Sequence, residues 1–139
     1  MEFNRQNVEQ ALKEASESNP GPWTEHTRYV AKACRNIAAR CNNISEEQAY
    51  LFGLLHDIGR YAGVTSEKHL LDGYRFCMER GWEKAAQICI SHAFMIQDIG
   101  TSIGKFDVSN EEYLFMKEFV ANAVYDDYDR LVQLCDSLA

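Results

Sequence analysis

The sequence predicts a single all-α domain of six or seven helices. Only eight glycines and two prolines occur among the 139 residues, fewer than a β architecture with many turns requires. Apolar residues recur along most of the chain with the 3.6-residue period of an amphipathic helix. Hydrophobic residues make up 46% of the chain, which is enough to build one core without disulfides. We therefore expect one compact domain over residues 1–139.

Seven segments carry this helical period. They are Asn4–Ser18, Trp23–Cys41, Ser45–Ile58, Glu67–Arg80, Glu83–Met95, Ser109–Val124 and Asp126–Leu138. The first ends at Asn19-Pro-Gly-Pro22, because proline cannot continue a helix. The third begins with the capping pattern Ser45-x-x-Gln48 and ends near Gly59. Gly81 separates the fourth helix from the fifth in a left-handed turn, and Ser109-x-x-Glu112 is a capping box that begins the sixth.

The predicted helices divide into two parts. Residues 1–22 form an N-terminal helix and turn, and residues 23–139 form the helical core. The connection Gln97–Ser109 is long for a compact domain and has no helical period, so we predict a lid over a functional site. We expect the acidic start of the last helix to be exposed to solvent, where its negative charges interact favourably with the helix dipole. Its residues are Asp126, Asp127 and Asp129.

Charge and cysteine content exclude several classes of protein. The formal net charge is −7, the wrong sign for a protein that coats nucleic acid. Five cysteines occur without a CxxC pair, which is typical of a reduced protein. The N-terminus has no apolar signal region, and no apolar run approaches the length of a bilayer span. We expect a cytoplasmic protein that does not enter membranes.

Residues able to bind a metal lie beside apolar helical positions. All four histidines do so, as do two aspartates; they are His26, His56, Asp57, His69, His92 and Asp136. Burying these groups separately would cost hydration without replacement. Imidazole and carboxylate are ligands that iron, manganese, zinc, cobalt and nickel accept. The sequence therefore predicts one or two divalent transition-metal ions of one of these elements.

The order of these residues resembles the HD-domain superfamily of metal-dependent phosphohydrolases. The resemblance runs from about Trp23 to the end of the chain. It rests on His26 and on the segments LLHDIGR, KHLLDGY, ISHAF and LVQLCDSLA. It implies an HD-type helical domain around a metal site and a small phosphorylated substrate, either a nucleotide or a related phosphate ester or anhydride.

The resemblance also implies roles for individual residues. One ion is held by His26, His56, Asp57 and Asp136. A second ion is held by His69 and His92, with Asp57 as a bridge between the two, so the catalytic residues are Asp57, His69 and His92. A water or hydroxide held by the ions attacks phosphorus, and no side-chain nucleophile is needed.

Two basic residues are candidates for binding the substrate phosphate. Arg60 lies three residues after Asp57, at the position where mononuclear nucleotidase-like members of the superfamily often have glutamate. The absence of this glutamate favours a two-metal site. Its planar guanidinium suits bidentate phosphate contact. Lys105 in the predicted lid is the second candidate. The chain lacks the Gly-Tyr-Pro signature of cyclic di-nucleotide phosphodiesterases, which disfavours that substrate.

Other interpretations stay open from the residues alone. Oxygenases that resemble this superfamily use the same four histidines and two aspartates around two irons, and the ligands do not distinguish iron from other ions. A non-catalytic binding module could keep a metal for stability, because metal binding supplies folding free energy. His69 taken alone could be a hydrogen-bonded core residue, and His56-Asp57 could be a helix cap.

Overall fold

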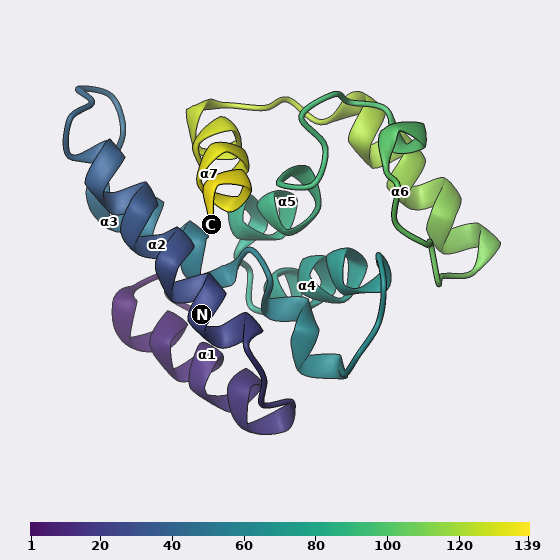
Figure 1. Ribbon diagram of the computed structural model, residues 1–139, viewed down its shortest axis with the longest axis horizontal. Helices are drawn as coiled ribbons and strands as arrows, with labels where there is room; N and C mark the ends of the chain where they lie inside the picture. The colour runs from purple at the N-terminus through teal and green to yellow at the C-terminus, as the bar shows by residue number, and fades with distance from the viewer.

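The computed structural model of residues 1–139 contains seven α-helices, two short 3-10 helices and no strand (Figure 1). The α-helices are α1 (Arg5–Ser18), α2 (Trp23–Ala38), α3 (Glu46–Leu55), α4 (Lys68–Glu79), α5 (Glu83–Ser91), α6 (Asn110–Asn122) and α7 (Asp127–Leu138), and the 3-10 helices are η1 (Ile58–Ala62) and η2 (Ile99–Thr101). The prediction of an all-α domain with six or seven helices is confirmed. None of these helices is both long and apolar enough to cross a membrane.

Local caps begin several of the helices where the sequence predicts them. The Ser45 hydroxyl accepts the Gln48 N–H at the start of α3. Ser109 and Glu112 form a complete capping box at the start of α6. Gly81 has a φ of 76° after α4, the left-handed conformation expected there, which glycine adopts without steric cost. These signals act over three or four residues, so they can be recognised without the tertiary structure.

The main core lies among α1, α2, α3, α4, α5 and α7. Every residue of α3 from Ala49 to Leu55 is buried, so this helix runs through the centre of the domain. A smaller cluster links α4 and α5 to α6; its buried members are Leu70, Leu71, Ile90, Phe94, Ile99, Met116 and Val120. Helix α6 lies at the edge of the molecule, apart from α1–α3 (Figure 1). The domain is therefore most densely packed around α3, whose C-terminal end leads into His56.

Helices α3 and α5 are shorter than predicted, and each stops at a histidine. The structure ends α3 at Leu55 and α5 at Ser91, so that His56 and His92 are the C-cap residues. After His56 the backbone leaves the helical region at Asp57, where φ is −110° and ψ is 17°. At both helix ends the imidazole stays hydrogen-bonded through Nδ1 to its own helix, to the carbonyl oxygens of Gly53 and Ile88.

Gly59 allows η1 to lie directly against α4. A Cβ atom at this position would be 1.9 Å from the His69 carbonyl oxygen and 2.5 Å from the Gly73 nitrogen. No side chain fits in this space, because such distances are far inside van der Waals contact. Gly59 was expected to end a helix, but its structural role is this close approach, which brings Asp57 next to the start of α4.

The connection Gln97–Ser109 docks on the N-terminus of α4, in place of the predicted lid. The Asp107 carboxylate accepts the N–H groups of Ser66 and Lys68 at 2.9 and 2.8 Å. The Lys105 carbonyl accepts the Glu67 N–H at 2.9 Å. Asp107 thus caps a helix that lacks a side-chain cap from its own N-cap residue. The connection therefore supports the first turn of α4, where His69 lies.

The prediction of a solvated acidic start for α7 is wrong for Asp129. This residue is fully buried, and its carboxylate accepts hydrogen bonds from Ser91 at 2.6 Å and from Gln87 and Lys84. Burial opposes ionisation, but these donors outweigh it and hold the pKa of Asp129 below its usual value. Because Ser91 precedes His92, the network fastens the end of α5 to α7.

Candidate metal centre

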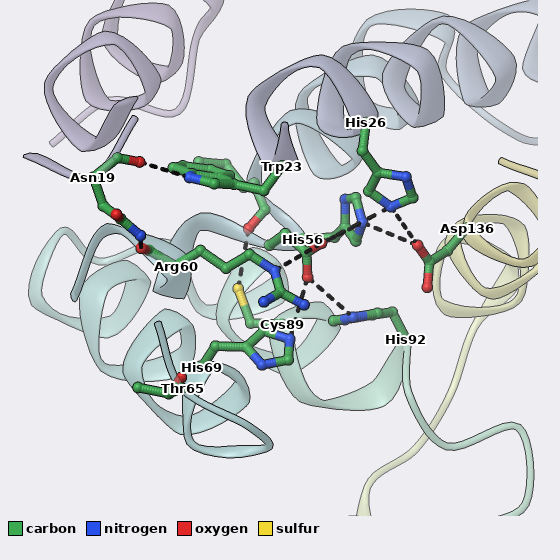
Figure 2. Close-up of polar contacts among 12 residues, drawn as sticks. Asn19, Trp23, His26, His56, Arg60, Thr65, His69, Cys89, His92 and Asp136 are labelled. Carbon is green, nitrogen blue, oxygen red and sulfur yellow. Dashed lines mark hydrogen bonds and ion pairs between the residues drawn. The ribbon is translucent and has the colours of Figure 1, made fainter. Parts of the chain in front are cut away.

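The six predicted ligands converge from different elements of the domain (Figure 2). His26 comes from the first turn of α2, and His56-Asp57 from the junction between α3 and η1. His69 lies in the first turn of α4, His92 at the end of α5, and Asp136 in the last turn of α7. The imidazoles and carboxylates form three overlapping triads. Within each triad, the candidate ligand atoms lie within 4.8 Å of one another. Residues separated by up to 110 positions in the sequence therefore share one site.

Asp57 lies between two pairs of imidazoles. Its Oδ1 atom is 3.4 Å from His69 Nε2 and 3.5 Å from His92 Nε2. Its Oδ2 atom is 3.5 Å from His56 Nε2 and 3.9 Å from His26 Nε2. Each oxygen thus faces a different pair, which is the arrangement of a carboxylate able to bridge two cations.

Backbone carbonyls orient three of the four imidazoles. The Nδ1 atoms of His56, His69 and His92 lie 2.7, 2.7 and 2.9 Å from the carbonyl oxygens of Gly53, Ser66 and Ile88. A carbonyl only accepts, so each Nδ1 carries the donated hydrogen. The Nε2 atoms then present lone pairs to the centre of the site, as metal-binding histidines do when a second group holds Nδ1–H.

The His56 Nε2 atom gives the clearest sign that a cation fits here. It is buried and has no hydrogen-bond partner, which is costly for a polar atom. Asp136 Oδ1 lies 3.3 Å from it and 2.8 Å from His26 Nε2. A divalent ion among these atoms would satisfy the unpaired nitrogen and both carboxylates. The donor set, with nitrogen and oxygen ligands and no thiolate, suits a transition metal such as iron, manganese or zinc.

The electrostatics of the site favour ionised carboxylates. Burial opposes ionisation of Asp57, but the charge of His56 and the neighbouring imidazoles of His69 and His92 lower its pKa well below the usual value. Burial likewise opposes ionisation of Asp136, yet the neighbouring His56 and His92 imidazoles lower its pKa to about 2. Desolvation lowers the pKa of His56, but the charges of Asp57 and Asp136 outweigh it and raise that pKa. The carboxylates are therefore ready to bind a cation without first losing a proton.

A hollow of about 560 Å³ opens onto five of the six ligand side chains, and its volume is within the usual size range of small-molecule sites. Its lining includes Asp57, His69, His92, His26 and Asp136, and Arg60 lines the same hollow. The Arg60 Nε atom is 3.5 Å from Asp57 Oδ2. Lys105 is exposed and is not among the lining residues, because its backbone is bound to Ser66 and Glu67. The structure thus places Arg60 at the site and leaves Lys105 outside it.

Three further residues shape the hollow, and no pattern in the sequence marks them as functional. Trp23 and Glu67 line it, and Asn19, the residue after α1, holds the Arg60 backbone (Figure 2). The Asn19 amide donates to the Arg60 carbonyl at 2.8 Å, and Trp23 Nε1 donates to the Asn19 carbonyl at 2.8 Å. Asn19 lies in the Asn-Pro-Gly-Pro segment that ends the first helix, and this role as a turn is enough to explain the residue from the local sequence. Only the tertiary contact with Arg60 reveals its second role.

Comparison with known proteins agrees with this geometry. The family model of the HD domain matches residues 23–139, the part of the chain that contains all six converging side chains. Neither the curated proteins nor the solved structures give a match. Because the family model covers most of the chain and the histidines and aspartates form a cluster compatible with its metal site, this chain belongs to the HD domain family.

Proposed function

We propose that this protein is a metal-dependent phosphohydrolase of the cytoplasm that acts on a nucleotide or a related phosphate ester or anhydride. The observation that carries the proposal is the position of Asp57, whose two carboxylate oxygens face different imidazole pairs. Membership of the HD domain family supports the same class of reaction. A site with one carboxylate between two cation positions suits hydrolysis at phosphorus better than it suits a purely structural ion.

The proposed ligands follow from the distances within the site. His26, His56, Asp57 and Asp136 would hold one divalent ion, and His69, His92 and Asp57 would hold a second. When bound, such ions polarise phosphoryl oxygens and activate water for attack on phosphorus. The protein's own contribution is to hold three of the four imidazoles in one tautomer through backbone carbonyls and to keep both carboxylates ionised.

Arg60 is proposed to bind the phosphate. Its side chain lines the hollow and is about one-third exposed, so part of the guanidinium is accessible from the hollow. Its contact with Asp57 Oδ2 is long, at 3.5 Å, which leaves N–H groups free for phosphoryl oxygens. Two parallel N–H donors suit a phosphate because they match the spacing of its oxygens. The hydrogen bond from Asn19 to the Arg60 carbonyl fixes the backbone from which the side chain extends.

Phosphate release from a substrate panel tests the proposal. The protein is loaded with Mn²⁺, Zn²⁺ or Fe²⁺ and assayed with nucleoside mono-, di- and triphosphates, dinucleoside polyphosphates and simple phosphate esters. We expect release from at least one class, loss of activity with a chelator, and recovery on adding the ion back. Failure to release phosphate from any member, with ions demonstrably bound, would contradict the proposal.

Two controls separate this function from its alternatives. Arg60→Lys keeps the positive charge but removes the planar pair of donors, so we expect about a tenfold higher KM with little change in metal content. Activity with redox-inert Zn²⁺ would contradict an oxygenase, whereas oxygen consumption by the iron-loaded protein without phosphate release would support one. If chelation unfolds the protein and no ion confers turnover, the metal has only a structural role.

A further inference from the structure

A second hollow opens beside the candidate metal centre. It has a volume of about 540 Å³ and shares His26 and Pro22 with the first hollow. Its other lining residues come from α2 and from the last turn of α7 and beyond; they are Glu25, Tyr29, Ala33, Cys135, Leu138 and Ala139. Because His26 and Pro22 line both hollows, the two hollows are adjacent.

The two hollows differ in chemistry. The first is lined by Arg60 and by imidazole and carboxylate groups. The second contains no lysine or arginine, and five of its eight lining residues are hydrophobic. Glu25, exposed on its rim, adds negative charge. An additional phosphate in this hollow would find no cation and would meet a carboxylate, so the hollow disfavours an extended polyphosphate and favours an uncharged group.

The lining also presents a surface for a flat ring. Tyr29 is 60% exposed although it lies on the same helix as the buried residues Val30 and Ala31. Ala33, one turn later, is small and only partly buried, so it leaves space beside the Tyr29 ring. An aromatic group placed there would gain apolar burial and the offset or edge contacts that aromatic rings prefer.

We infer that this second hollow binds the uncharged, flat organic group attached to the substrate phosphate. The location of the phosphate rests on the proposed function, whereas binding of the ring rests on the second hollow alone. Cys135, which lines this hollow, directly precedes Asp136, and Asp136 contacts His26. The ring would therefore lie beside the first metal position, and the phosphate would lie across His26 toward Arg60. The substrates selected are phosphates that carry a single compact aromatic substituent.

Ligand titration of the Zn²⁺-loaded protein, followed by amide chemical shifts, tests the inference without turnover. The probes are benzylphosphonate and methylphosphonate, which share the anionic group and differ in the ring. We expect benzylphosphonate to bind at least about tenfold more tightly and to shift the amides of Tyr29 and Ala33. A second pair, adenosine monophosphate and ribose 5-phosphate, shows whether a nucleobase serves as the ring.

Ala33→Phe fills the second hollow and supplies the decisive variant. It should reduce the preference for benzylphosphonate to less than about twofold, with methylphosphonate affinity unchanged. Tyr29→Ala, at an exposed position, provides a variant that perturbs folding less and should reduce the same preference. The matched control is Ala121→Phe on the exposed side of α6, which should alter neither affinity.

The possible results separate this inference from the proposed function. Equal binding of the two phosphonates, or a preference that survives Ala33→Phe and Tyr29→Ala, would overturn the inference even if the protein hydrolyses phosphate esters. Ring-dependent shifts at Tyr29 and Ala33 in a protein that releases no phosphate would uphold the second hollow and contradict the proposed reaction.

Discussion

Replacement of Gly59 by alanine tests whether the contact between η1 and α4 builds the metal centre. The added Cβ would lie 1.9 Å from the His69 carbonyl oxygen, whereas ordinary contact begins at 3.4 Å. The two segments would have to separate by about 1.5 Å, because both neighbouring atoms belong to backbone that cannot rotate away. Overpacking of this size costs roughly 3 kcal/mol of folding free energy. The separation would also move Asp57 away from His69.

The assay combines chemical denaturation with metal analysis of the folded variant. For Gly59→Ala we expect about 3 kcal/mol less stability, a fall of about 10 °C in Tm and weaker loading of the ion assigned to His69 and His92. A displacement of about 1 Å in a catalytic site commonly costs about 100-fold in rate. Gly21→Ala is the matched control, since a Cβ there would meet Trp23 at an ordinary 3.5 Å and should change stability by less than about 0.5 kcal/mol. Wild-type stability and metal content in Gly59→Ala would refute the reasoning.

Three other predictions concern single side chains of the site and its support. Asp57→Ala should abolish both metal loading and turnover, because it removes the carboxylate between the imidazole pairs; unchanged metal content by elemental analysis would reject this role. His69→Ala should mainly remove the second ion and lower the metal-to-protein ratio toward one, because the ligands of the first ion are unchanged. Asp129 has a folded-state pKa below that of the unfolded chain, so its stabilisation is present above about pH 4 and is lost as the pH falls further. Asp129→Asn should be about 2 kcal/mol less stable at pH 7 and should lose less stability than the wild type on acidification; parallel denaturation curves across pH would contradict this.

Local signals explain why the helical architecture is predictable from the sequence. The capping residues Ser45 and Ser109 act within one turn of their helices, and the apolar period identifies the buried side of α1. The candidate ligands are also recognisable, because imidazole and carboxylate groups beside apolar helical positions are unusual without a compensating partner. The structure brings all six of these side chains together, and their individual roles as ligands stay predictions.

Long-range contacts explain the differences. Periodicity extends α3 past His56, because it contains no information on the packing of Gly59 against α4; it likewise extends α5 past His92. Asp129 has the sequence context of an exposed helix start, and its partners Lys84 and Ser91 lie about 40 positions away. Lys105 has the features of a phosphate-binding loop residue, yet hydrogen bonds with Ser66 and Glu67 place it outside the hollow. No local pattern reports such pairings.

Anomalous X-ray scattering from crystals grown with Zn²⁺ or Mn²⁺ tests the central claim most directly. We expect a peak about 2.0–2.2 Å from the Nε2 atoms of His26 and His56 and from carboxylate oxygens of Asp57 and Asp136. A second peak is predicted on the opposite side of Asp57, at similar distances from the Nε2 atoms of His69 and His92. Crystals that contain the metal but show no anomalous peak among these six side chains would contradict the account.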